Sequence, residues 1–228
     1  FNSFKPYKSP GMDNIYPALI QQGIDYLVSS IVHMYRECLV QGKSPKRWLE
    51  SKVTFIPKPG KQDYSLPKNL RPISLTSCLL KGLQRLIHWF INSTRLRNNL
   101  NDKVFAYREG TSTEDPLHRL VYKIEKALEK GETAIVLFMD MDAAFSSASI
   151  NGIIRNMERL EVQPIFLKWS EHMLSNRTVT AYLNDESASK EVDNGTPQGG
   201  ILSTDYWNGD GDDLVTRLSA EPTTEINN

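Results

Sequence analysis

The clearest pattern of apolar positions lies at residues 134–145, which read AIVLFMDMDAAF. The first six residues of this stretch are all apolar, and they predict a strand that is buried on both faces of a sheet. Asp140 follows at the predicted end of the strand. A dry and unpaired carboxylate is strongly unfavourable there, which favours a bound divalent cation. An Asp that caps a helix or forms a turn is the simpler alternative, and the residues alone leave both open.

Apolar residues at helical spacing predict several helices elsewhere in the chain. They are expected at 25–41 with Gly42 as a C-terminal cap, at 79–91, from Ser112 or Thr113 to Lys130, at 150–160 after a Ser149 cap, and at 164–175. The helix that ends near Lys130 is expected to turn these apolar residues inward: Leu117, Leu120, Val121, Ile124, Ala127 and Leu128.

Alternating apolar and polar residues predict strands at 52–57 and 178–183. A turn that begins at Asn184 and Asp185 is expected to join the second strand to a hairpin partner at 190–193. The segment from residue 219 onward has few apolar residues and is expected to be frayed.

Charge is distributed unevenly along the chain. The 228 residues can form one domain or two subdomains, and 27 basic residues balance 27 acidic ones. Residues 43–71 nevertheless carry eight basic and two acidic side chains, whereas residues 203–228 carry six acidic and one basic. Such polarity is consistent with a face that meets phosphate, and a solvated basic face is the alternative.

The two cysteines, Cys38 and Cys78, lie in apolar helical patterns. Buried thiols in a reducing compartment are therefore expected rather than a disulfide or a metal site. No apolar run approaches the length of a membrane span, and no signal-peptide pattern is present. Because the chain opens on Phe1, we expect a soluble intracellular piece of a longer protein.

Three ordered blocks carry the functional information. Residues 138–145 fit the pattern Phe-x-Asp-x-x-x-Ala-Phe, residues 195–203 fit Gly-Thr-Pro-Gln-Gly-Gly-x-Leu-Ser, and residues 56–75 contain Ile-Pro-Lys-Pro-Gly-Lys and Arg-Pro-Ile-Ser-Leu. Together they resemble the first palm motif, the second palm motif and the fingers motif of the reverse transcriptases of non-LTR, LINE-type (jockey-like) retrotransposons. The resemblance runs from Lys5 to about Asp213.

This resemblance implies the α+β right-hand architecture of an RNA-directed DNA polymerase, with an antiparallel palm sheet packed on helices. The fingers would comprise residues 1–76 and 149–196, and the palm would comprise residues 77–148 and 197–228. The chain would end before the family's Tyr-x-Asp-Asp hairpin. The pair Asp212-Asp213 resembles instead the end of the helix that follows the Gln-Gly-Gly motif.

The family's reaction is an in-line displacement at phosphorus that uses two Mg²⁺ ions. By resemblance, Asp140 supplies a catalytic carboxylate ligand and the carbonyl of Met141 a further oxygen ligand. Asp142 is expected to be an outer acid or a surface residue. A lone Asp140 cannot hold two cations, so this chain is expected to be inactive by itself.

The resemblance also assigns an incoming deoxynucleoside triphosphate to particular residues. Lys58 and Arg71 would take the triphosphate. Phe145 would be the steric gate that excludes a ribose 2′-hydroxyl, with core packing as the alternative. Ala144 would let the sugar approach the backbone, and Gln198 would contact the nucleotide or the template.

Contacts with the RNA template and the DNA primer are expected at further positions. Gly199 and Gly200 lie beside Gln198, and residues 5–13 resemble a template-contacting segment of the family. Lys61 and Lys68 are expected either to contact backbone phosphates or to be solvated. Arg108 lies in the segment 107–113, which resembles Phe-Arg-x-Gly-x-Ser-Thr; it would contact nucleic acid or remain an ordinary surface residue.

Two other functions remain open at this point. The chain could be a degenerate, non-catalytic remnant that binds only template–primer or nucleotide, or it could come from another palm polymerase. The parent element is expected in the nucleus and cytoplasm.

Overall fold

The structure is a computed structural model that describes residues 1–94, 96–141, 144–183 and 186–220. The helices are α1 (Pro17–Gln22), α2 (Ile24–Gln41), α3 (Lys46–Leu49), α4 (Cys78–Thr94), α5 (Leu96–Asn99), α6 (Glu114–Glu129), α7 (Ala144–Ser147), α8 (Ile150–Arg159), α9 (Pro164–Ser175) and α10 (Ser203–Ala220), with a 3₁₀ helix η1 (Pro67–Asn69). The strands are β1 (Glu50–Pro57), β2 (Leu70–Leu75), β3 (Arg177–Leu183) and β4 (Glu186–Val192).

The described residues form one four-stranded sheet in the order β2-β1-β3-β4. Strands β1 and β2 pair antiparallel, as do β3 and β4, whereas β1 and β3 run parallel, with Glu50 opposite Thr178. The expected α+β class is confirmed. The sheet is mixed rather than antiparallel throughout, because a long helical crossover from β2 to β3 brings β3 beside β1 in the same direction.

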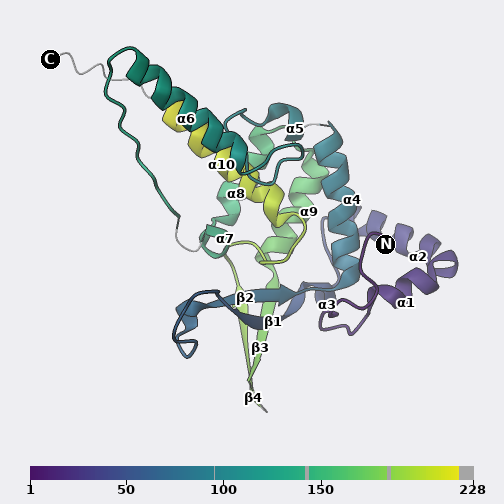
Figure 1. The fold of residues 1–228 in the computed structure, drawn as a ribbon. Helices are drawn as coiled ribbons and strands as arrows, with labels where there is room; N and C mark the ends of the chain where they lie inside the picture. Colours follow the sequence, from purple (N-terminus) through teal and green to yellow (C-terminus); the bar gives the residue numbers. More distant parts are fainter. Residues whose placement is uncertain (95, 142–143, 184–185, 221–228) are drawn as a thin grey trace.

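Helices α4, α8, α9 and α10 gather above this sheet, and the β3–β4 hairpin extends away from them (Figure 1). Their facing apolar side chains form the core, and Leu83, Ile153 and Trp169 are at most 1% exposed. Burying one such side chain stabilises the fold by roughly 1.5–3 kcal/mol. The predicted helices at 25–41, 79–91, 150–160 and 164–175 are confirmed as α2, α4, α8 and α9.

Local signals define several helix ends as predicted. Gly42 closes α2 with φ of 68°, and its N–H donates to the carbonyls of Cys38 and Leu39. Ser149 begins α8, because its hydroxyl accepts a hydrogen bond from the N–H of Gly152. These caps orient the helices that carry the core.

The two cysteines are buried and free, as expected. Burial raises the pKa of the Cys78 thiol to about 11, so it stays protonated near neutral pH. Over the described ranges, no helix has the length and apolar content needed to cross a bilayer.

The predicted buried strand at 134–139 is wrong. Residues 132–141 have no regular secondary structure, and Leu137 and Phe138 are 78% and 82% exposed. A strand needs a neighbour to pair its N–H and C=O groups. Among the described residues, β2 and β4 form the edges of the sheet, and neither pairs with this segment.

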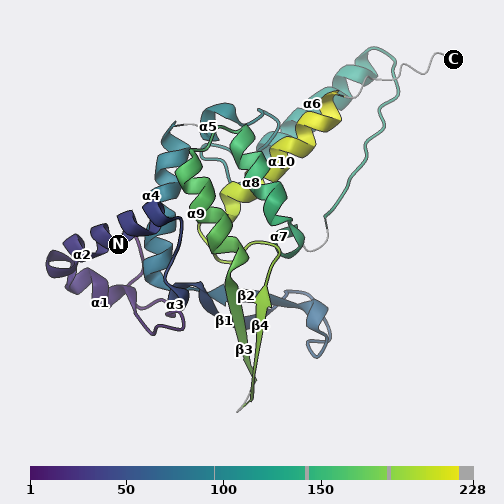
Figure 2. The same ribbon diagram turned by 180° about the vertical axis from the view of Figure 1, so that it is seen from behind.

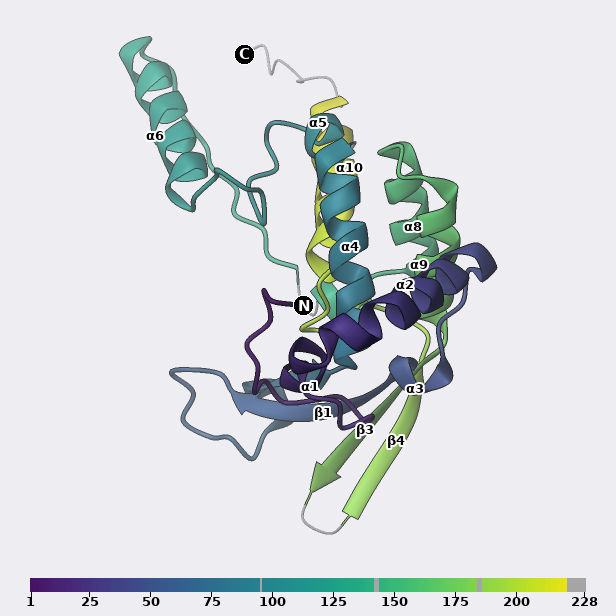
Figure 3. The same cartoon turned by 90° about the vertical axis from the view of Figure 1, so that its right-hand side faces the viewer.

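The inward-facing stripe predicted for the helix at 114–129 is also wrong. Helix α6 forms, but none of its residues is buried, and Leu117 and Leu128 are about 60% exposed. Figure 3 shows α6 standing away from the other helices, and Figure 2 shows the chain leaving α6 in an extended path as far as residue 141. A helical period identified the element, but no described element covers its apolar face.

Two predictions lie outside the described residues: the role of Asp142 and the turn at Asn184 and Asp185. Most of the ending predicted to be frayed from residue 219 onward lies outside them too, but its first two residues, Ser219 and Ala220, form the end of α10. The fingers and palm boundaries also stay predictions, although β1, β2, β3 and β4 all come from the two segments assigned to the fingers.

Candidate nucleotide and nucleic-acid interface

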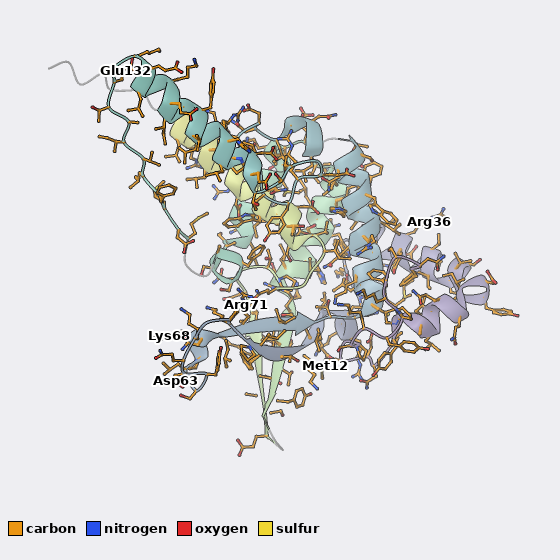
Figure 4. All side chains as sticks on the ribbon, in the orientation of Figure 1. Met12, Arg36, Asp63, Lys68, Arg71 and Glu132 are labelled. Carbon is orange, nitrogen blue, oxygen red and sulfur yellow. The ribbon has the colours of Figure 1, made fainter. Side chains whose placement is uncertain are left out.

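The β1–β2 hairpin gathers basic side chains at its free end. Arg71 pairs with Ile56 across the two strands, and Lys58 follows β1 directly. The Lys58 N–H donates to the Asn69 carbonyl at 2.9 Å, and the Lys58 ammonium donates to the Lys68 carbonyl at 2.8 Å. Figure 4 shows Lys68 and Arg71 at this end of the hairpin. The strand pairing therefore places Lys58, Lys68 and Arg71 together.

A turn at 194–200 joins the second palm block to the first. The N–H of Gly195 donates to the Ala148 carbonyl at 2.7 Å, and the N–H of Thr196 donates to the Phe145 carbonyl at 2.6 Å. Gly195 has φ of 67°, and an added Cβ would lie 2.5 Å from the Ser146 carbonyl oxygen. Glycine is therefore required by both the backbone conformation and the close approach.

The same turn is fixed to the hairpin. The N–H of Ser74 in β2 donates to the Gln198 carbonyl at 2.9 Å. On the other side, the Gly200 N–H donates to the Pro197 carbonyl at 2.8 Å, and so does the Ser203 hydroxyl at 2.9 Å. All three sequence blocks thus meet through backbone hydrogen bonds.

Their meeting point is a cleft of about 560 Å³. Its walls include every residue that the sequence assigned to the nucleotide, together with one further lysine: Lys58, Lys68, Arg71, Ala144, Phe145 and Gln198. The volume falls within the range of roughly 300–1,000 Å³ that is usual for small-molecule sites. Cations from the hairpin therefore lie across the cleft from the start of α7.

Aromatic neighbours surround Phe145 at the wall of the cleft. Its ring centroid lies 6.3 Å from that of Tyr107 in an edge-on arrangement and 5.5 Å from that of Trp207. Phe145 is half-buried rather than a core residue. This packing limits the positions of the ring while leaving one side of it in the cleft.

Sequence reasoning missed Arg177, which also lines the cleft. This side chain is buried, and its guanidinium donates to the carbonyls of Leu174, Asn194 and Gly195 at 2.6–2.9 Å. Burial lowers the pKa of Arg177 to about 10, which still leaves it charged at neutral pH. An Arg at the start of an alternating strand gives no signal of such a role.

Comparison with known proteins decides the family. The family described as reverse transcriptase (RNA-dependent DNA polymerase) matches residues 56–221. The chain belongs to the reverse transcriptase family. The resemblance to the enzymes of non-LTR retrotransposons is confirmed by its relatives.

Three relatives illustrate the kinship. A protein named probable RNA-directed DNA polymerase from transposon BS, of Drosophila melanogaster, is 32% identical over 86% of this chain and 22% of its own length. The RNA-directed DNA polymerase from mobile element jockey of the same species is 26% identical over 96% of this chain and 24% of its own length. The retrovirus-related Pol polyprotein from type-1 retrotransposable element R2, of Popillia japonica, is 30% identical over 81% of this chain and 26% of its own length. The chain thus spans about a quarter of these relatives.

The metal ligands expected of a reverse transcriptase do not form a centre in the described part of this chain. Asp140 is exposed in the irregular segment, and Met141 beside it is 49% exposed. The described residues contain no group of three or more His, Cys, Asp or Glu side chains that could hold a metal ion. One exposed carboxylate and a neighbouring carbonyl do not fit a two-ion site, so no metal-dependent step is assigned to these residues.

The pair Asp212-Asp213 lies in α10, the helix that follows the Gln-Gly-Gly motif, as predicted, but in the middle of this helix rather than at its end. Asp212 is 2% exposed and accepts hydrogen bonds from the Asn101 N–H and the Arg159 guanidinium. These contacts hold the loop after α5 and helix α8 against α10, so Asp212 has a structural role.

The remaining predicted nucleic-acid residues do not share one site. Lys61 is exposed in the hairpin loop outside the cleft. Gly199 lines a second groove of about 460 Å³ whose walls carry four basic residues: Lys5, Lys8, Lys81 and Arg85. Gly200 packs against Pro197, and Arg108 lines a separate pocket beside α4.

Proposed function

We propose that this chain is the nucleotide- and template-binding part of an RNA-directed DNA polymerase. The cleft carries the proposal, because three cations from one hairpin lie across it from Ala144 and Phe145. A triphosphate requires several positive groups, and Arg and Lys donors on a rigid hairpin provide them. Lys58, Lys68 and Arg71 are assigned to the triphosphate, and Phe145 to the sugar.

Binding of a fluorescent deoxynucleoside triphosphate, followed by anisotropy, tests the cleft. Arg71→Ala should weaken binding roughly 10- to 150-fold, because a charge-assisted hydrogen bond contributes roughly 1.5–3 kcal/mol. Lys61→Ala is the matched control, since Lys61 lies in the same hairpin outside the cleft. Equal binding by the two variants would contradict the assignment.

The gate assigned to Phe145 has its own test. Phe145→Val shortens a side chain that Tyr107 and Trp207 hold at the wall. It should reduce the preference for deoxyribonucleotides over ribonucleotides roughly tenfold or more, as steric changes of this size do. Competition between dTTP and UTP measures the preference, and an unchanged ratio would leave core packing as the role of Phe145.

We assign the groove beside Gly199 to the phosphates of the template strand. Four basic side chains line it. Each lost contact with a phosphate of a single strand should make the slope of log affinity against log salt less negative by roughly 0.7. Lys8→Ala is expected to show this loss with a 12-nucleotide RNA. Arg36→Ala is the control, because Arg36 is exposed on α2 far from the hairpin (Figure 4).

The chain alone is proposed to be inactive in nucleotide addition. The exposed Asp140 and the missing carboxylate partners in the described ranges support this. Primer extension on an RNA template with Mg²⁺ should give no product. Incorporation that Asp140→Asn abolishes would overturn the proposal. A non-catalytic remnant is the second candidate, favoured by the same lone carboxylate, and would show binding without extension in any longer form of the protein.

A further inference from the structure

The pocket beside α4 that Arg108 lines has a volume of about 470 Å³. Tyr107 also lines it, and the Tyr107 ring contacts Phe145 of the nucleotide cleft. Helix α4 supplies His88, Trp89 and Asn92, the loop before α6 supplies Tyr107 and Arg108, and α10 supplies Asn208. The volume of this pocket lies in the range of roughly 300–1,000 Å³ typical of ligand sites.

Two aromatic side chains stand exposed at this pocket. Trp89 and Tyr107 are 54% and 60% exposed, and they come from different elements. Exposed aromatic faces in single-strand binding proteins serve as surfaces on which unpaired bases stack. Arg108 in the same lining provides a charge for the adjoining phosphate, beside one acid, Glu109.

The inner wall is polar and incompletely paired. Asn208 is 3% exposed, and its side-chain oxygen has no hydrogen-bond partner in the described part of the chain. Buried polar atoms are normally paired, so an unpaired one at a pocket points to a bound group with a complementary atom. Next to it, Asp205 accepts from the His88 ring nitrogen and from the Asn92 amide, at 2.7 and 2.9 Å.

Tyr107 links this pocket to the nucleotide cleft. It lines the pocket and contacts Phe145 edge-on, and Phe145 lines the cleft. One aromatic pair therefore lies between the two cavities, which makes them neighbours.

We infer that this pocket holds an unpaired base of a single-stranded nucleic acid, stacked on Trp89 and Tyr107, with Asn208 pairing the base edge and Arg108 near its phosphate. The inference rests on the proposed function, because it extends the same strand path beyond the nucleotide cleft. The ligand class is a nucleobase on a sugar–phosphate chain.

Trp89→Ala tests the inference on the whole chain. Anisotropy of labelled 12-nucleotide RNA and DNA should show binding roughly 5- to 150-fold weaker, which corresponds to the roughly 1–3 kcal/mol of one stacked base. Trp89→Phe should restore most of the affinity, whereas Trp89→Leu should not. Leu86→Ala is the control, because Leu86 is 49% exposed on α4 outside the pocket. Thermal unfolding should be unchanged, since Trp89 is exposed.

An abasic 12-mer separates base stacking from phosphate binding. Wild-type chain should bind it as weakly as Trp89→Ala does, and Trp89→Ala should bind the abasic and normal strands alike. The inference is overturned if neither nucleic acid binds, if Trp89→Ala equals Leu86→Ala, or if Trp89→Leu binds as well as Trp89→Phe. Triphosphate binding to Arg71→Ala and Lys61→Ala is measured separately, so failure of the nucleotide cleft and failure of this pocket are distinguishable.

Discussion

Replacing Gly195 with Ala tests whether the two palm blocks depend on one close backbone contact. Gly195 has φ of 67°, a conformation that raises the free energy of an L residue by roughly 1–2 kcal/mol. The new Cβ would also lie 2.5 Å from the Ser146 carbonyl oxygen and 2.6 Å from that of Phe145. Both neighbours are backbone atoms, so no side-chain rotation relieves the overlap.

Relief of this overlap requires the turn to move away from α7. That movement breaks the hydrogen bonds from Gly195 to Ala148 and from Thr196 to Phe145, at 2.7 and 2.6 Å. Each contributes roughly 1 kcal/mol net. Adding the backbone conformation gives a loss of roughly 3–4 kcal/mol in the free energy of unfolding.

Gly60→Ala is the matched control, because Gly60 has φ of 76° and no atom within 4 Å of an added Cβ. It should lose only the roughly 1–2 kcal/mol of the backbone conformation. Urea unfolding followed by far-ultraviolet circular dichroism measures both, and the difference should be roughly 2 kcal/mol. Equal losses in the two variants would refute the reasoning that close approach fixes this position.

Other substitutions and conditions test other parts of the structure. The hydrogen bond to Asp205 raises the pKa of His88 above its usual value. The stability that the protonated His88 contributes is therefore complete below about pH 6.5 and is lost as the pH rises through the raised pKa. His88→Gln should remove this part of the pH dependence of the free energy of unfolding in urea. Asp212→Ala should lower the free energy of unfolding by roughly 2–4 kcal/mol, because Asp212 is 2% exposed and accepts two hydrogen bonds. Asp213→Ala removes a pair with Arg217, which is 77% exposed, and should change the free energy of unfolding by less than about 1 kcal/mol. Equal effects of the two substitutions would contradict the structural role of Asp212. Limited digestion with chymotrypsin should cut first near Phe138, because Phe138 is 82% exposed and has no strand partner among the described residues. Mass spectrometry of the first fragments locates the cut, and a first cut inside α4 or α9 would contradict this expectation.

Local sequence signals predicted the helices of this chain well. Helix α9 begins and ends at the predicted residues 164 and 175, and α2 ends at the predicted glycine. Such elements depend on periodicity and on caps within a few residues. The apolar faces of α2, α4, α8 and α9 pack into one core, whereas the apolar face of α6 does not.

Local signals failed for residues 134–139, which were predicted to be buried and are exposed. Six consecutive apolar residues show that a segment prefers to be covered, but they do not show what covers it. Leu137 is 78% exposed because no described strand lies beside it. The prediction of a strand therefore failed because a local pattern does not show whether a distant segment of the chain will pair with it.

In the cleft between the β1–β2 hairpin and α7, by contrast, the sequence blocks identified residues that the fold brings together. Three of its basic residues come from 58–71, and the fourth, Arg177, begins β3. The other walls come from β1, β2, β3 and the segments 144–146 and 192–198. The motifs named the residues but could not say that Arg177 would hold the turn through three carbonyls. Arg177 acts on backbone oxygens, which every residue type carries, so the partner positions have no sequence signature. A motif reveals side chains that meet a ligand, whereas the residues that position those side chains emerge only from the fold.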